Sequence, residues 1–595
     1  MNAGTPQFPQ VHIDQPNQAS PVTEFWGSDA MAEMLRALDL PYIALNPGAS
    51  YRGLHDSLVN YLGNARPQML LCLHEDVAVS IAHGYAKASE RMMGAALHSN
   101  VGLMHATMSV FNAWCDRVPM MILGATGPWD AAKRRPWIDW IHTMSDQGAL
   151  IRNFTKWDNQ PASVPAMYEA MARGSQIAET APRGPVYINL DAALQESKLT
   201  SLPPVPDMGR FAAPPAIKPD LDEVRRAAQW LSQAKNPAII IGRVSRSVDG
   251  WRDRVALAEK LNATVFTDLK CGAAFPTDHP LHFGWPGVNQ LPVGLEAVKQ
   301  ADVILALDNV DLGGTLKQAY GEGPITAKIV RVSVDQHSHR GFGMEYHVLP
   351  PADAYLLCEP DAAVTALLGA VTARKGPAPT QPNSPQARMT AEVTIATLAY
   401  SLNEATRNLD VSITRLPLGW HGAYRAFRHP LDYLGADGGA GIGSGPGMTI
   451  GAALALAGSG RIPVGVLGDG DFMMASSAIW TAAHYKIPCL MIVANNRSYY
   501  NDELHQERVA KTRSRPVENK WVGQRISEPD IDIAAIARAQ GAEGIGPVQR
   551  IEDLQGAIKR GIEAVQAGKV CVLDVRVLPG YDTDATGVGA AVKRG

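Results

Sequence analysis

The chain has 595 residues, of which 46% are hydrophobic and 19% charged, and its formal net charge is −4 at pH 7. This length predicts several domains, and the composition is that of an ordinary globular protein. So small a net charge gives no reason to expect nucleic acid or an anionic membrane as a partner. The longest apolar runs are strand-sized, well short of the roughly 20 residues that a membrane helix needs.

The start of the chain and its cysteines suggest a cellular location. Residues 1–23 are polar and rich in proline and glutamine, without the apolar stretch of a secretory signal, so we expect a flexible tail. Six cysteines are scattered without CxxC spacing: Cys72, Cys115, Cys271, Cys358, Cys489 and Cys571. Such cysteines are typical of small buried hydrophobic residues in a reducing compartment. We therefore predict a cytoplasmic protein without disulfides.

Two proline-rich stretches, at 201–220 and 374–388, divide the chain into three parts of similar size. Their composition is typical of linkers and not of packed structure. Each remaining part is long enough for a core of its own. We predict an N-terminal domain at 24–200, a central domain with its linkers at 201–385, a C-terminal domain at 386–574, and a tail or lid at 575–595.

Within each part, short apolar segments bounded by turns alternate with helical patterns. These segments lie at 42–48, 69–75, 94–100, 120–126 and 185–191 in the first part, at 237–242, 263–268, 302–307 and 328–335 in the second, and at 411–416, 463–471, 488–496 and 569–577 in the third. Fully apolar strands separated by helices are typical of parallel sheets that helices cover on both faces. The sequence therefore predicts an α/β protein with three doubly wound parallel-sheet domains, whose ligands bind beyond the carboxyl ends of strands.

Two polar turns follow consecutive strands of the third part. Asp469 lies in the Gly-Asp-Gly turn between Gly468 and Gly470, and Asn496 ends the Asn-Asn pair after the next strand. One carboxylate, one amide oxygen and one backbone carbonyl, completed by phosphate oxygens and water, form the octahedral oxygen shell that Mg²⁺ prefers. The glycines let the backbone approach phosphate groups closely. Two unrelated surface turns are the alternative, but they do not explain why both fall at the carboxyl ends of neighbouring strands.

This stretch resembles the thiamine-diphosphate motif of the 2-keto acid decarboxylase and acetolactate synthase superfamily, and the resemblance extends over residues 24–575. It implies that Asp469, the Asn496 side chain and the Ser498 carbonyl hold Mg²⁺, which anchors the diphosphate of the cofactor. It also implies further cofactor contacts from Gly441, Gly468, Gly470 and Asp471. Because the family's site lies between two subunits, the resemblance implies a homodimer or homotetramer.

The resemblance assigns two residues to the reactivity of the cofactor. Glu75, in "LHEDVAVS", matches the glutamate that protonates the aminopyrimidine N1′ and so enables ylide formation. The structural alternative for Glu75 is an acid that is favourable at a helix N-terminus. Ile442 matches the bulky apolar residue that lies under the bent cofactor.

Within the superfamily, three stretches resemble the benzoylformate decarboxylases: residues 45–50, 97–114 and 477–488. By this resemblance His98, in "LHSNVG", is a catalytic acid/base whose imidazole relays protons near neutral pH. A lone histidine at a strand end is otherwise most often structural. His74, Asn100, His105, Trp114 and His421 are further candidates for the pocket.

Three departures from that pattern concern the substrate. Ala49 stands where the decarboxylases have a serine that contacts the substrate carboxylate, with Ser50 one place later, and a second catalytic histidine has no counterpart. After the metal motif, Asn501, Asp502 and His505 replace small and apolar residues. Buried polar groups need partners, so these residues predict a polar substrate unless the segment is an exposed loop.

The central part has no GxGxxG and no other clear dinucleotide motif, so we do not expect FAD. The sequence thus predicts a thiamine-diphosphate- and Mg²⁺-dependent enzyme that cleaves or forms a C–C bond next to a carbonyl. Its substrate is a small polar carbonyl compound, and the reaction is that of a non-oxidative 2-keto acid decarboxylase or of a 2-hydroxyketone or diketone lyase. An acetolactate-synthase-like carboligase and a non-catalytic cofactor-binding paralogue are the alternatives.

Overall fold

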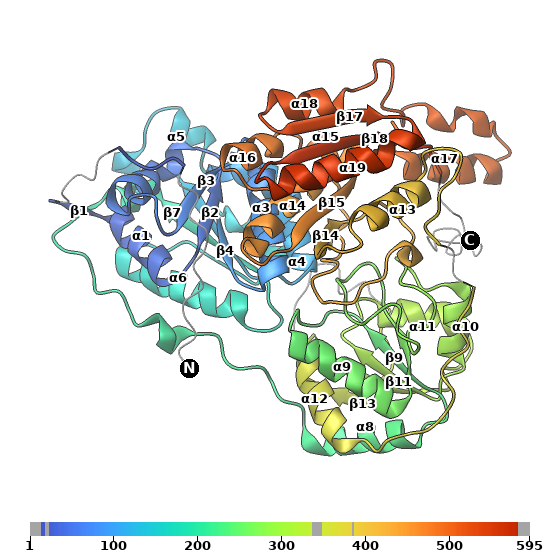
Figure 1. The fold of residues 1–595 in the computed structure, drawn as a ribbon. Coiled ribbons are helices and arrows are strands. Elements are labelled where there is room, and N and C mark those ends of the chain that lie inside the picture. Colours follow the sequence, from blue (N-terminus) through green and yellow to red (C-terminus); the bar gives the residue numbers. More distant parts are fainter. Residues whose placement is uncertain (1–12, 18–22, 336–347, 384–385, 581–595) are drawn as a thin grey trace.

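The computed structural model describes residues 13–17, 23–335, 348–383 and 386–580, and three parallel sheets organise them (Figure 1). The predicted tails fall partly outside the described residues, at 1–12, 18–22 and 581–595. Each of the thirteen segments predicted as strands contains a strand. The predicted α/β class with three parallel-sheet domains is confirmed, while the exact domain boundaries stay predictions.

The N-terminal sheet has six strands in the order β3-β2-β4-β5-β7-β6. They are β2 (Tyr42–Leu45), β3 (Gln68–Leu71), β4 (Met93–Leu97), β5 (Met120–Thr126), β6 (Trp157–Asn159) and β7 (Pro185–Asp191). Helices α3 (Glu75–Ser89) and α4 (Ser99–Cys115) pack on one face, and α1 (Gly27–Ala37) and α6 (Val164–Glu179) on the other. Short helices α2 (Arg52–Asp56), α5 (Ile138–Ile141) and α7 (Ala192–Gln195) lie in its loops. A small antiparallel pair, β1 (Phe25–Trp26) with β8 (Lys198–Leu199), joins the two ends of this region.

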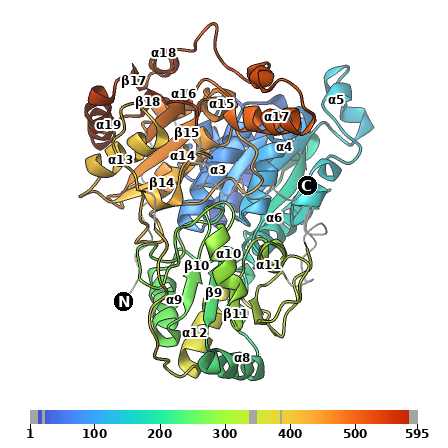
Figure 2. The same ribbon diagram turned by 90° about the vertical axis from the view of Figure 1, so that its right-hand side faces the viewer.

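The central sheet has the order β10-β9-β11-β12-β13. Its strands are β9 (Pro237–Ile241), β10 (Thr264–Phe266), β11 (Val303–Leu307), β12 (Lys328–Val332) and β13 (Ala354–Leu356). Helices α8 (Leu221–Gln233), α9 (Val248–Leu261) and α12 (Pro360–Ala370) cover one face, and α10 (Pro292–Lys299) and α11 (Leu312–Tyr320) cover the other. Both ribbon views place this domain apart from the other two sheets (Figures 1 and 2).

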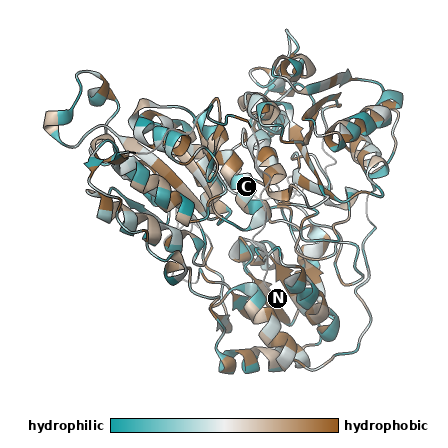
Figure 3. Ribbon diagram, turned by 60° about the vertical axis from the view of Figure 1, so that its left-hand side comes forward, coloured by the Kyte–Doolittle hydropathy of each residue, from teal (hydrophilic) through white to brown (hydrophobic). Residues whose placement is uncertain are grey.

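The C-terminal sheet has the order β14-β15-β16-β18-β17. Its strands are β14 (Val411–Arg415), β15 (Ile462–Gly468), β16 (Leu490–Asn495), β17 (Glu543–Val548) and β18 (Cys571–Arg576). Helices α14 (Gly445–Leu456), α16 (Ala478–His484) and α18 (Ile533–Ala539) lie on one face, and α13 (Ile395–Ala405) and α19 (Ile551–Gln566) on the other. Many of the surface helices show a hydrophilic outer stripe and a hydrophobic inner one (Figure 3).

Five strands were not predicted: the short antiparallel pair β1 and β8, and three edge strands of the parallel sheets. β6 and β13 have only three residues each, and β17 reads Glu-Gly-Ile-Gly-Pro-Val. Glycine and proline weaken a strand pattern and are tolerated mainly at sheet edges, where backbone pairing is needed on one side only. The sequence pattern of a strand is therefore weakest at the edges of the sheets.

One hydrophobic core joins the N-terminal and C-terminal domains. It contains buried side chains of α3 and α4 together with those of α14, α16, β15 and β16. A Cβ on Gly451 of α14 would lie 1.9 Å from the backbone oxygen of Ile81 in α3, so only glycine permits this approach of the two helices. The Tyr485 hydroxyl accepts from the Leu71 amide at 2.8 Å, and Thr481 donates to the Leu71 carbonyl at 2.9 Å, which satisfies the edge of β3.

A cavity of about 550 Å³ lies where the three domains meet. Charged residues from each domain line it, among them Lys87, Asp116, Arg117, Arg243, Arg246, Arg415 and Asp437. The Arg246 guanidinium of the central domain donates to the backbone oxygen of Lys87 at 3.2 Å and to that of Leu434 at 2.8 Å. A single side chain of the central domain thus contacts both of the other domains.

Candidate active site

The two polar turns of the C-terminal sheet come together as predicted. Asp469 begins the short helix α15 (Asp469–Met474) directly after β15, and Asn496 follows β16, which pairs with β15 in parallel. The Ser498 amide lies 3.2 Å from Asp469 Oδ2 and 2.9 Å from Asn496 Oδ1. One backbone N–H therefore holds the carboxylate and the amide oxygen beside each other. A Cβ on Gly470 would lie 2.5 Å from the Tyr499 ring, so the glycine lets the two turns pack.

The two asparagines of the Asn-Asn pair have different tasks. Asn495 is buried, and its side chain donates to Asp574 of β18 at 2.9 Å and accepts from the Arg497 amide at 3.1 Å. Asn495 therefore links β16 to β18 and shapes the turn. The Asn496 oxygen instead accepts from the same Ser498 amide as the Asp469 carboxylate. The Ser498 hydroxyl donates to the buried Glu503 carboxylate at 2.6 Å, which secures the turn from behind.

The chemistry of this donor set fits a divalent cation. Asp469 is 5% exposed, and among the described residues it forms no ion pair with lysine or arginine. Burial raises the pKa of Asp469 to about 6, because removal from water disfavours the charged form. A buried carboxylate that lacks a protein cation, next to a neutral amide oxygen, is the kind of site that Mg²⁺ compensates.

Asp471 and Gly441 lie in contacts that position the loop before α14. The Asp471 carboxylate accepts from the Gly443 amide at 2.7 Å and from the Gly445 amide at 3.3 Å. Asn112 of α4 donates to the Gly441 carbonyl at 3.2 Å. Ile442, between these anchors, keeps 37% of its surface exposed. A loop held from both sides can present this apolar side chain in a fixed position.

Glu75 begins α3 and is 6% exposed, inside a small cluster with His74 and His105. His105 Nδ1 lies 3.0 Å from Glu75 Oε2, and its ring stacks on that of His74 with centroids 5.0 Å apart. Ligand-type atoms of these three residues lie within 4.8 Å of one another. However, His74 Nδ1 already accepts from the Asp76 amide at 3.2 Å, and His105 Nδ1 faces Glu75. The cluster is therefore a hydrogen-bond network around Glu75.

His98 follows β4 directly and caps the start of α4. Its Nδ1 lies 2.9 Å from the Ser50 hydroxyl, so the residue after Ala49 supports the predicted acid/base. A Cβ on Gly48 would lie 2.2 Å from the His98 ring, and glycine is thus required for this contact. Burial, reinforced by the neighbouring His142, lowers the pKa of His98, which favours a neutral imidazole.

His142 was not predicted from the sequence. It follows α5 on a segment that extends from the N-terminal domain (Figure 2), and its ring packs edge-on against His98 with centroids 4.8 Å apart. Asn100, a predicted pocket residue, donates to the Ile141 carbonyl at 3.1 Å and so anchors this segment. No local pattern around residue 142 indicates the contact, because it depends on how a loop folds back over α4.

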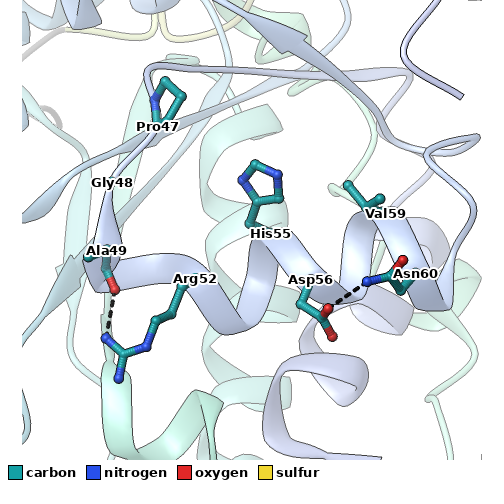
Figure 4. A pocket seen from close by; sticks show the side chains of 8 residues that line it. All are labelled: Pro47, Gly48, Ala49, Arg52, His55, Asp56, Val59 and Asn60. Carbon is teal, nitrogen blue, oxygen red and sulfur yellow. Dashed lines mark hydrogen bonds between the residues drawn. The ribbon is translucent and has the colours of Figure 1, made fainter. Parts of the chain in front are cut away.

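Ala49 lies on the wall of an open cavity of about 630 Å³ (Figure 4). Arg52 donates to the Ala49 carbonyl at 3.0 Å and Asn60 donates to the Asp56 carboxylate at 2.7 Å, as the dashed lines show. The loop at 47–49 thus has this cavity on one side and the His98 ring against Gly48 on the other. A small residue at position 49 leaves room there.

The polar segment after the Asn-Asn turn, for which an exposed loop was the alternative, is a helix. Asn501, Asp502 and His505 lie in the first turns of α17 (Tyr500–Thr512). Acidic side chains in its first turn favour a helix there, because they complement the helix dipole. Asp502 and His505 are exposed in the single chain, and Asn501 is partly buried.

Two other predicted pocket residues lie in the interior. His421 is fully buried with its ring 5.1 Å from that of Trp285 in the central domain, and its Nδ1 accepts from the Ala423 amide at 3.0 Å. Trp114 is buried near the end of α4. His421 thus packs between the C-terminal and central domains, whereas Trp114 lies in the interior of the N-terminal domain.

Models of three thiamine pyrophosphate enzyme domains match the chain. The N-terminal TPP binding domain matches residues 25–150, the central domain 224–355, and the C-terminal TPP binding domain 417–575. Both turns of the candidate site and most strands of the three sheets lie within these matches, while β6, β7 and β14 lie outside them. Among the described residues, no helix combines the length and the apolar character needed to span a membrane.

Individual relatives differ in their reactions. Benzoylformate decarboxylase of Pseudomonas aeruginosa is 25% identical over 564 residues, which cover 90% of this chain and 96% of that protein. The acetolactate synthase large subunit of Lactococcus lactis is 24% identical over 490 residues, covering 79% and 81%. The crystal structure of benzoylformate decarboxylase from Polynucleobacter necessarius superposes with a TM-score of 0.76 at 21% identity, covering 94% of this chain and 99% of that one, and supports the fold alone.

Proposed function

Because this chain belongs to the thiamine pyrophosphate enzyme family, we propose that it is a thiamine-diphosphate- and Mg²⁺-dependent enzyme that cleaves, and in reverse forms, a C–C bond next to a carbonyl. The substrate is a small polar carbonyl compound, either a 2-keto acid or a 2-hydroxyketone or diketone. The observation that carries the proposal is the pairing of Asp469 and Asn496 through one shared amide, at the carboxyl ends of adjacent strands. A buried Glu75 adds the acid that this chemistry requires.

Each residue of the site has a defined task in this reaction. Asp469, Asn496 and the Ser498 carbonyl bind Mg²⁺ and with it the diphosphate. Glu75 holds a proton at the aminopyrimidine nitrogen, and His105 fixes the orientation of its carboxyl group. His98, whose Nδ1 is engaged by Ser50, uses Nε2 to move a proton to or from the substrate. Bound thiamine diphosphate supplies the nucleophilic carbon and the electron sink.

The surroundings of His98 favour a lyase over a simple decarboxylase. Ser50, the hydroxyl nearest to the position where decarboxylases bind a carboxylate, is engaged with His98 Nδ1, and Ala49 offers no polar group. A substrate carboxylate would therefore have to share the Ser50 hydroxyl with His98, since Ala49 adds no donor. Because an acetolactate synthase is among the relatives, ligation to a second carbonyl compound is the second candidate function.

Exposed apolar side chains beside Glu75 support an assembly that completes the site. Leu73 is 48% exposed, Met104 is 50% exposed and Met108 is 38% exposed, and each lies within three residues of Glu75 or His105 in the sequence. Exposed apolar side chains that gather on one face of a protein mark interfaces. We propose a homodimer or homotetramer in which this face meets the metal turns of another copy. All six cysteines are free, in keeping with a reducing, cytoplasmic setting.

A turnover screen with thiamine diphosphate and Mg²⁺ tests the proposal. It compares 2-keto acids, 2-hydroxyketones and 1,2-diketones, and follows CO₂ release as well as aldehyde and acid products. Glu75→Gln should still bind the cofactor but lose turnover by about 10²-fold or more, the usual effect of removing an acid/base. Glu90→Gln, at the other end of α3, is the matched control and should keep its rate. Wild-type turnover in Glu75→Gln would refute the assignment.

A further inference from the structure

The strongest unassigned feature of the site is the second histidine that touches His98. We propose that His142 is a positioning residue, which pairs with His98 and sets that imidazole for proton transfer. The inference rests on the proposed function only in taking His98 as the acid/base. The contact itself belongs to the cofactor-free chain, where it can be tested without any turnover.

The geometry of the pair fixes the ring of His98 on two sides. The His142 ring lies edge-on to it at an interplanar angle of 85° and a centroid distance of 4.8 Å. Tyr51 packs edge-on from another direction at 6.5 Å, and Ser50 holds Nδ1 at 2.9 Å. Aromatic rings in edge-to-face contact restrict each other's rotation. Nε2 is consequently the nitrogen that His98 presents to a reacting group.

The backbone locks the two histidines together. The Ser99 hydroxyl donates to the His142 backbone oxygen, and the Asn100 side chain donates to the carbonyl of Ile141. Both anchors come from the residues directly after His98, so they tie the segment of His142 to the start of α4. Ser99 has φ +51°, a left-handed conformation that is unfavourable for serine. Backbone strain of this kind persists where the surrounding structure enforces a required geometry.

The charges around His98 give the pair a second effect. Among the described residues, His142 and Tyr51 pack against His98, and the charge of Glu75 also acts on it. Burial and His142 lower the pKa of His98, while Glu75 raises it. A positive charge on His142 therefore opposes protonation of His98. The Ser50 hydroxyl can donate or accept, so neutral His98 can offer Nε2 as a proton donor or as an acceptor.

Two substitutions separate the effects of ring contact and of charge. His142→Phe keeps an aromatic edge against His98 and removes the ionisable group, whereas His142→Ala removes both. His279→Phe is the matched control, because His279 also packs edge-on against an aromatic ring, that of Phe275, but lies in the central domain.

The first measurement follows hydrogen–deuterium exchange at the histidine ring carbon by mass spectrometry in the cofactor-free protein, which reports the titration midpoint of His98. The midpoint should rise by roughly half a pH unit or more in His142→Phe and His142→Ala, since a nearby positive charge is lost, and stay unchanged in His279→Phe. An unchanged midpoint in both His142 variants overturns the electrostatic part of the inference.

The second measurement is the pH profile of turnover with whichever substrate the screen identifies. His142→Phe should keep kcat within about threefold at pH 8 and move the acidic limb to higher pH, while His142→Ala should lower kcat about tenfold with little change in KM. Profiles that superimpose on the wild type overturn the positioning role. If no carbonyl substrate turns over at all, the proposed function fails, and the exchange measurement still decides the pairing of the two histidines.

Discussion

The raised pKa of Asp469 leads to a quantitative prediction for metal binding. The carboxyl must be ionised to bind Mg²⁺, and its pKa is about 6 in the metal-free protein. At pH 7.5 nearly all of the protein has the ionised form, whereas at pH 5 only about one molecule in eleven does. The other proposed ligands, the Asn496 amide oxygen and the Ser498 carbonyl, do not titrate in this range. Affinity should therefore fall about tenfold between these pH values, close to 1.4 kcal/mol.

The assay is a titration with Mn²⁺, followed by its paramagnetic resonance signal, in the presence of saturating thiamine diphosphate. The diphosphate also titrates, so Mn²⁺ binding to free cofactor is measured at each pH and subtracted. Asp471→Asn is a useful comparison, because that carboxylate is satisfied by the Gly443 and Gly445 amides and should not set the pH dependence. A corrected affinity that changes less than twofold between pH 7.5 and pH 5 would refute the reasoning.

Three further substitutions test the packing and the hydrogen bonds around the site. Gly451→Val should destabilise the fold by about 3 kcal/mol or more in urea unfolding, because its Cβ would meet the Ile81 backbone; Gly369→Ala, in open space, should be neutral or slightly stabilising. Asn495→Ala should cost about 1–3 kcal/mol of stability by removing the buried hydrogen bond to Asp574 Oδ1, whereas Asn496→Ala should mainly weaken Mn²⁺ binding. Equal effects of both substitutions on metal affinity would contradict the division of tasks. Ser50→Ala should lower kcat about tenfold and leave the urea midpoint nearly unchanged, and an unaltered rate would remove Ser50 from the support of His98.

The candidate site residues at strand ends could be predicted from the sequence because each is identified by the strand just before it. Asp469, Asn496, Glu75 and His98 each follow an apolar strand within a few residues, and a parallel sheet brings such ends to one edge. His142 could not be found in this way. It lies on a segment without sheet strands, and its contact with His98 arises from the anchoring of that segment on Ser99 and Asn100.

The sequence pattern also could not predict which side chains are buried and which have hydrogen-bond or ion-pair partners. The Asp469 and Asp471 carboxylates stand two residues apart in one motif, yet Asp471 is satisfied by two backbone amides and Arg415 while Asp469 has no basic partner among the described residues. The sequence at 501–505 was compatible with a loop. The structure shows that this stretch forms the first turns of α17, with acidic side chains at the helix start. Which carboxylate is available to bind a cation can therefore be inferred only from the structure.

The core that α3 shares with α14 has a consequence for how this chain is assembled. Residues on either side of that core are separated by the entire central domain, so the domain amounts to a long insertion into a single cooperative unit. Closing a loop grows more costly only with the logarithm of its length, which makes such an insertion easy to tolerate and easy to exchange. Excision of the central domain would nevertheless uncover the C-terminal core that Trp251, Leu269 and Ala273 help to bury, and either half of the unit expressed alone would present the bare face of its shared core to water.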